Sequence, residues 1–195
     1  MNVAKYKNPS LKTKERVEDL MSRMTFEQKI DQITCLVTIT PDIGAFTVSD
    51  DADMIVEYAY QLQKFLMEET ELGIPALIHC EACSGAQFTD ANVFPSAIGQ
   101  ASTFHPEIIQ EMADIIRQQM YAVGFRQALS PVLDVARDPR WGRTTETYGE
   151  DPALIAAMGS AFVKGIQSED ISEGTLATAK HFVGHGITEG GINMG

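Results

Sequence analysis

Apolar residues recur at helical spacing in the first third of the chain. In residues 11–24 they follow the i, i+3, i+4, i+7 pattern of an amphipathic helix. Thr25 with Gln28 three residues later forms the pattern of a capping box and predicts a second helix. Aspartates at 50–51 are placed to cap a third helix, and β-branched residues within 34–49 predict a strand before it. The apolar positions of the first helix are Val17, Leu20, Met21 and Met24.

From residue 76 onward, short apolar runs alternate with longer helical patterns. The runs at 76–80, 125–135 and 176–183 are typical of buried strands. Helical patterns lie between them at 106–123 and 152–167, each with a proline in its first turn. Strands that alternate with helices predict βαβ units and a parallel sheet, so we expect an α/β fold.

Two α/β architectures fit this order, a doubly wound sheet and part of a (β/α)8 barrel. A glycine-rich phosphate turn after the first strand would favour the doubly wound sheet, and the sequence has none there. The tripeptide Gly184-His185-Gly186 has the spacing of the first two glycines of that pattern, but position 189 is Glu and no helical pattern follows. The length of 195 residues corresponds to about one domain.

Composition and charge indicate which kinds of partner and which cellular compartment fit this sequence. The chain carries 15 Lys and Arg against 27 Asp and Glu, a net charge of −12, which disfavours nucleic acid and anionic membrane surfaces as partners. No apolar run is long enough to span a bilayer, and the polar residues 1–14 do not resemble a signal peptide. Three cysteines are too few for a disulfide framework. We therefore expect a cytoplasmic protein.

Polar side chains able to do chemistry lie at or just beyond the ends of the predicted strands. Glu81 follows the first strand. Asp134 lies at the end of the second strand, and Arg143 follows it. Lys180 and His181 lie in the last strand. In a barrel, the loops that follow the strands carry the active site, so we expect these side chains to converge on one face. Neighbouring residues of a regular strand point to opposite faces. The backbone around Lys180 and His181 should therefore be irregular if both act on one ligand.

These residues also have purely structural interpretations. A carboxylate such as Glu81 after a strand commonly stabilises the first turn of a helix. The loop around Arg143 is rich in both signs of charge, so its arginines and carboxylates, Glu146 among them, can neutralise one another. Lysine is almost never fully buried unless it is paired, so Lys180 should have a carboxylate or a polar ligand as its partner.

A structural zinc site is a further alternative. Cys80 and Cys83 form a C-x2-C pair, and His181 and His185 form an H-x3-H pair, which together offer four ligands. The two pairs are 97 residues apart, against roughly 12–15 in zinc fingers. No helical pattern begins at Cys80 to lower a thiol pKa, which also disfavours a thioredoxin-like role.

Three segments carry the most specific motifs. The longest is Ser130-Pro-Val-Leu-Asp-Val-Ala-Arg-Asp-Pro-Arg-Trp-Gly-Arg143, which is followed by Glu146-Thr-Tyr-Gly-Glu-Asp-Pro152. The others are Lys180-His-Phe-Val-Gly-His-Gly186 and the acidic loop His79-Cys-Glu-Ala-Cys-Ser-Gly85. Together they resemble the N-terminal domain of family 3 glycoside hydrolases, the β-glucosidase and β-xylosidase group. The resemblance runs from about Leu20 to Gly195.

The resemblance implies a role for six side chains. By position, Glu81, Arg143, Lys180 and His181 match the residues with which the family holds the hydroxyls of a terminal sugar. Asp134 and Glu146 would orient Arg143 or Lys180. Charged groups that bind hydroxyls from several sides suit a pocket for one glycosyl unit.

The resemblance also implies groups that these 195 residues do not supply. The family's retaining mechanism needs a carboxylate nucleophile and a separate acid/base. In the family the nucleophile is an Asp, usually followed by Trp, downstream of the Lys-His pair, whereas Trp141 is the one tryptophan here and belongs to another motif. The acid/base comes from a second domain. We therefore expect no catalytic residue within this chain.

A complete (β/α)8 barrel takes about 250 residues, so we interpret residues 1–195 as the N-terminal portion of a TIM-type barrel domain, incomplete in this chain. The parent enzyme would hydrolyse terminal β-D-glycosyl residues of a small β-linked glycoside or oligosaccharide, with no cofactor and no metal. The rest of the barrel and a second domain would be its missing partners. A sugar-binding remnant without catalysis is the main alternative.

Overall fold

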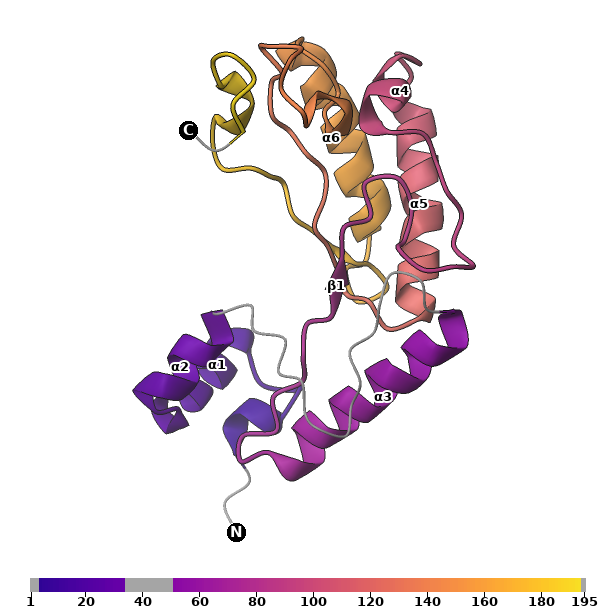
Figure 1. Ribbon diagram of the computed structural model, residues 1–195. Coiled ribbons are helices and arrows are strands. Elements are labelled where there is room, and N and C mark those ends of the chain that lie inside the picture. Colours follow the sequence, from indigo (N-terminus) through magenta and orange to yellow (C-terminus); the bar gives the residue numbers. More distant parts are fainter. Residues whose placement is uncertain (1–3, 34–50, 194–195) are drawn as a thin grey trace.

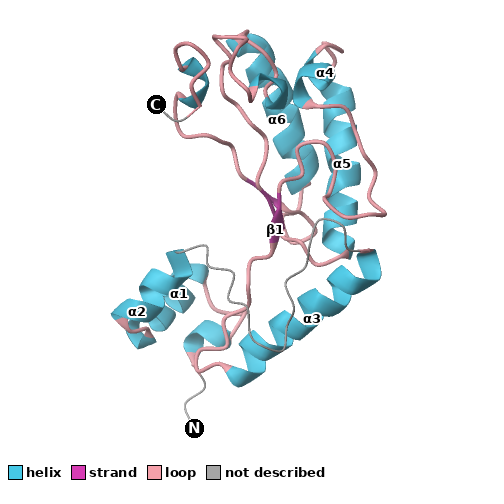
Figure 2. Ribbon diagram, in the orientation of Figure 1, coloured by secondary structure: helices cyan, strands magenta, loops and turns pink. Residues whose placement is uncertain are grey.

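The computed structural model describes residues 4–33 and 51–193 (Figure 1). Helices and loops make up most of it, and a short strand is seen in the middle of the ribbon (Figure 2). The longer helices are α1 Thr13–Arg23, α2 Phe26–Ile33, α3 Ala52–Glu69, α5 Pro106–Ala122 and α6 Pro152–Gln167. The shorter ones are α4 Ala97–Ala101 and the 3₁₀ turns η1 Lys5–Lys7, η2 Thr144–Glu146 and η3 His185–Ile187. The strand predicted at 34–49 lies outside the described residues.

Three strands pair in parallel and in chain order. They are β1 His79–Cys80, β2 Gln127–Ala128 and β3 Leu176–Ala177. His79 pairs with Gln127, which in turn pairs with Leu176. The alternation of strands with helices and the parallel pairing confirm the α/β prediction. The sheet is open, and the part of the chain that the structure describes does not close a barrel.

The strands are shorter than the sequence predicted, since each of the three apolar runs keeps only two residues in a strand. Pro131 explains one interruption, because proline has no N–H to donate to a neighbouring strand. Pairing resumes beyond it as an isolated bridge between Val132 and Lys180, where the Leu133 N–H donates to the Lys180 carbonyl at 2.6 Å. The prediction that Lys180 and His181 lie in the last strand is therefore wrong, because β3 ends at Ala177, but the backbone around them is irregular, as predicted. Its peptide bond to His181 is cis.

Polar side chains cap α2 and α3 at the positions that the sequence predicted. The Gln28 N–H donates to Thr25 Oγ1 at 3.2 Å, and the Thr25 N–H donates to Gln28 Oε1 at 2.9 Å. Asp51 caps α3 by accepting from the Met54 N–H at 2.9 Å, and Asp151 caps α6 in the same way. Helix α4 was not predicted, because its five residues are too few to show a helical period.

Helices α5 and α6 lie side by side (Figure 1) and form most of the core together with the sheet. Ile108 and Ile115 of α5 are exposed, whereas the residues that follow them, Ile109 and Ile116, belong to the buried face of the helix. No helix within residues 4–33 and 51–193 is long and apolar enough to cross a membrane. The largest fully buried side chains of the two helices are Ile109, Ile116, Met120, Met158, Phe162 and Ile166.

Candidate functional site

Lys180 and Glu81 form a direct contact between the loops after β3 and β1. Lys180 Nζ donates to Glu81 Oε2 at 2.5 Å, across 99 positions of sequence. The Lys180 side chain is 14% exposed and that of Glu81 is 46% exposed, so the lysine is enclosed and its partner faces solvent. The expected carboxylate partner of Lys180 is therefore confirmed. No described helix begins within the ten residues after Glu81, so the helix-capping interpretation of Glu81 is wrong.

Arg143 and Glu146 form the second pair, with Arg143 just before the turn η2 and Glu146 at its end. Arg143 Nε and Nη2 donate to the two oxygens of Glu146 at 2.9 and 2.7 Å, a two-pronged contact. The Arg143 guanidinium holds the pKa of the Glu146 carboxyl below its ordinary value. Glu146 is thus the direct hydrogen-bond partner of Arg143, a contact that the expected orienting role requires. Part of the structural interpretation also applies, because this loop does neutralise some of its own charge.

His181 and Asp134 form the third pair. Asp134 Oδ2 lies 2.7 Å from the ring atom Nδ1 of His181, and it accepts from the backbone N–H of His181 at 3.2 Å. Its other oxygen accepts from the Gly186 N–H at 3.3 Å. The Asp134 side chain is 1% exposed. The expectation that Asp134 orients Arg143 or Lys180 is wrong, because Lys180 turns to Glu81 and leaves the adjacent His181 to meet Asp134.

The three pairs form one electrostatic cluster. The pKa of Glu146 is lowered chiefly by Arg143 and further by the charges of Lys180 and His181. The pKa of Arg143 is raised chiefly by Glu146 and further by Glu81 and, by a smaller amount, Asp134. The six candidate side chains therefore lie near one another beyond the carboxyl ends of the strands. They include the four whose convergence the sequence predicted, Glu81, Arg143, Lys180 and His181. Besides His181, the cluster contains two basic side chains and three carboxyl groups.

Two free thiols lie on either side of Glu81, Cys80 at the end of β1 and Cys83 on the loop after it. Burial raises the pKa of the Cys80 and Cys83 thiols to about 11, the opposite of what a redox-active thiol requires. Among residues 4–33 and 51–193, no group of three or more His, Cys, Asp or Glu side chains is arranged so that it could hold a metal ion. The zinc alternative therefore has no supporting geometry.

Two pockets border the cluster. One, of about 290 Å³, is lined by Lys180 and His181, and Phe182 and Val183 at its edge are exposed. The other, of about 300 Å³, is lined by Glu81. Lys180 and Glu81 are in contact, so each of the two pockets is lined by one member of their ion pair.

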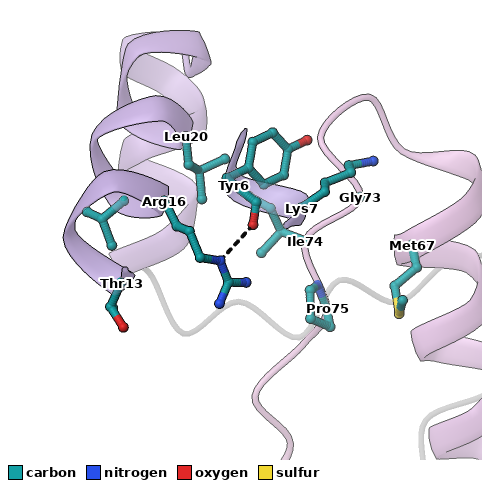
Figure 3. A pocket seen from close by; sticks show the side chains of 10 residues that line it. Tyr6, Lys7, Thr13, Arg16, Leu20, Met67, Gly73, Ile74 and Pro75 are labelled. Atoms are coloured by element: carbon teal, nitrogen blue, oxygen red, sulfur yellow. Dashed lines mark hydrogen bonds between the residues drawn. The ribbon is translucent and has the colours of Figure 1, made fainter. Parts of the chain in front are cut away.

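A third pocket, of about 570 Å³, lies at the N-terminal helices and not at the cluster (Figure 3). Arg16 Nε donates to the Tyr6 carbonyl at 2.9 Å, and the Tyr6 hydroxyl donates to the Leu72 carbonyl at 2.6 Å. These bonds attach η1 to α1 and to the loop after α3. The lining is mainly apolar and has no carboxylate, so it lacks the paired donors and acceptors of the cluster.

The sequence of residues 13–195 matches the family model for the glycosyl hydrolase family 3 N terminal domain. A β-xylosidase of Formosa agariphila is 42% identical over 134 residues, which cover 64% of this chain and 18% of that protein. A periplasmic β-glucosidase/β-xylosidase of Dickeya chrysanthemi is 30% identical over 221 residues, which cover 95% of this chain and 34% of that protein.

Solved structures show the same likeness. The β-glucosidase from Listeria innocua, in complex with isofagomine, matches 93% of this chain and 27% of its own chain, with a TM-score of 0.72 and 28% identity. The chain thus spans about a fifth to a third of the length of the proteins it matches.

Proposed function

Because the chain belongs to glycosyl hydrolase family 3, we propose that it is the N-terminal portion of the (β/α)8 barrel domain of an exo-acting β-glycosidase. The whole enzyme would hydrolyse terminal, non-reducing β-D-glucosyl or β-D-xylosyl residues with retention. Residues 1–195 supply sugar-binding groups, and the nucleophile and the acid/base lie outside them. The observation that carries this proposal is the Lys180–Glu81 contact, which joins the ends of two strands at a solvent-facing carboxylate.

The cluster has donors and acceptors left over for sugar hydroxyls. Lys180 has three N–H donors and uses one on Glu81, while Arg143 has five and uses two on Glu146. Glu81 keeps further lone pairs, since a carboxylate has about four acceptor sites. A hydroxyl both donates and accepts, so one hydroxyl can bridge Lys180 and Glu81 in a charge-assisted geometry.

Asp134 and Glu146 act through their neighbours in this proposal. Glu146 fixes the plane of Arg143, and Asp134 occupies Nδ1 of His181 and leaves Nε2 for the ligand. Cleavage with retention uses two carboxyl groups about 5–5.5 Å apart, and that chemistry involves no cofactor. A cytoplasmic location remains our proposal, whereas the relative from Dickeya chrysanthemi is periplasmic by name.

The test compares the 195-residue chain with the protein encoded by the complete gene, on aryl β-glucoside and β-xyloside. We expect the complete protein to hydrolyse one of them with retention and the 195-residue chain to hydrolyse neither. Arg143→Ala in the complete protein should lower kcat/KM by about 10- to 100-fold, the value of a hydrogen bond to a charged group. Sugar binding by a complete protein that does not hydrolyse either substrate would favour the sugar-binding remnant.

A further inference from the structure

The tripeptide Gly184-His185-Gly186 forms a turn that is fixed tightly against the chain after β2. Gly184 has a φ of +93°, a left-handed conformation that favours glycine. The Gly186 N–H donates to Asp134, and the Gly186 carbonyl accepts from the Arg137 N–H at 3.2 Å. A Cβ on Gly186 would lie 2.6 Å from the Val135 carbonyl oxygen. The two glycines therefore fix where the side chain between them can go.

That side chain, His185, lies between two other rings. Its ring meets Trp141 edge-on, with centroids 5.3 Å apart and planes at 87°. It meets His181 with centroids 4.8 Å apart and planes at 68°. Trp141 is itself immobilised, because it is almost fully buried and its indole N–H donates to Asn193 Oδ1 at 2.8 Å. Such edge-on ring pairs are energetically favourable.

We propose that His185 is a positioning residue for His181. Asp134 fixes one nitrogen of the His181 ring, but a single hydrogen bond leaves the ring free to pivot about it. The edge of His185, backed by the buried Trp141, removes that freedom. Nε2 of His181 is thereby held in one direction toward the ligand. This inference rests on the sugar-binding role of His181 in the proposed function.

The proposal predicts that His185 acts only through His181, which a double-mutant cycle measures. In the protein encoded by the complete gene, His185→Ala should lower kcat/KM about fivefold, with most of the change in KM. In the His181→Ala background, the same change should cost less than about twofold. His185→Phe, which keeps an aromatic edge, should retain most of the activity. If His185→Ala lowers the Tm by many degrees, His185→Leu takes its place in the cycle.

Three results would overturn the proposal. Equal losses in both backgrounds would mean that His185 supports the fold and not His181. Unchanged kcat/KM in His185→Ala, with a large loss in His181→Ala, would remove the role of His185 and leave the proposed function intact. Unchanged kcat/KM in His181→Ala would instead show that His181 does not bind the sugar. The positioning role of His185 and the sugar-binding role of His181 would then both fail.

Discussion

The N-terminal helices and the α5–α6 pair show the same amphipathic pattern but differ in burial. Helices α1 and α2 bury no residue, and Phe26 at the start of α2 is 73% exposed. Helices α5 and α6 bury five and seven residues, and Phe162 of α6 is fully buried. Periodicity therefore predicts a helix, whereas burial depends on whether another element offers a surface to cover.

This difference in burial matters for the candidate site, because its side chains follow the strands that pack with α5 and α6 and not the helices α1 and α2. Asp134 and Arg143 follow β2, and Lys180 and His181 follow β3, which comes after α6. A close-packed support holds rotamers in place, and a precise arrangement of ligand-binding groups requires this.

The largest expected effect is on the packed part. Phe162→Ala should lower the free energy of unfolding by about 3–5 kcal/mol, through lost burial and the cavity left behind. Urea denaturation of the variant and the unchanged protein measures it. A loss below about 1 kcal/mol would show that α6 is not held in a close-packed core.

The second prediction concerns the thiols beside Glu81. The pKa of Cys80 and Cys83 is raised from 9.0 to about 11, and only the thiolate reacts with iodoacetamide. At pH 8 the thiolate fraction, and so the alkylation rate, should be about 100-fold lower in the native than in the urea-unfolded protein, since each pKa unit is tenfold. The rate should rise with pH until about pH 11.

The alkylation experiment has a control in the less packed part. It is made in a Cys35→Ser background, because Cys35 lies outside the described residues. Val17→Cys places a thiol on an exposed position of α1, and that thiol should react at nearly the unfolded rate. Equal protection of Cys80, Cys83 and the thiol of Val17→Cys against alkylation would contradict the difference in packing between α1 and the region around Glu81.

Two ion pairs of similar geometry make the third test. Arg23 lowers the pKa of Asp19 in α1, and Arg143 lowers that of Glu146. Arg23→Met and Arg143→Met should each raise the pKa of the partner carboxyl, measured by NMR titration. Only Arg143→Met should also weaken sugar binding, by about tenfold or more. Equal weakening in Arg23→Met would mean that the proposed site is not local.

The pH dependence of stability follows from the same pair. The pKa of Glu146 is lower in the folded than in the unfolded protein. The stabilisation by Arg143 is therefore fully present above the unfolded pKa, about 4.3 for Glu, and is lost as the pH falls through the folded value. Arg143→Met should remove this part of the acid destabilisation, which urea denaturation across that pH range measures.

The smallest expected effect is at Phe26. Its ring is mostly exposed, so Phe26→Ala should change the free energy of unfolding by no more than about 0.5 kcal/mol. The urea experiment used for Phe162→Ala measures it. A loss comparable to that of Phe162→Ala would show that α2 is covered in the protein as it exists.

Local signals predicted the longer helices and the caps of α2, α3 and α6, since a capping box or an Asx cap involves residues two or three apart. Strand lengths could not be predicted in this way, because each pairing depends on a partner far along the chain. Pro131 is an exception, since its missing N–H is readable from the sequence and marks where the pairing with β3 breaks.

The candidate site shows the same division. Placement after strands was enough to bring together Glu81, Arg143, Lys180 and His181. The partner of Asp134 was assigned wrongly, because the direction in which Lys180 turns is decided by tertiary contacts. His185 was seen only as part of a glycine pattern or a zinc pair. Its ring contacts depend on how the turn packs against the chain after β2, which no local pattern encodes.

The order of the sheet has a consequence for how the protein is made. Each of β2 and β3 pairs with a strand synthesised 48 or 49 residues earlier. At about 5–20 residues per second, a ribosome completes such a unit in roughly 2–10 seconds, far longer than an isolated helix needs to form. These three strands can therefore be added one at a time in the direction of translation, without any of them waiting for a partner from the far end of the chain.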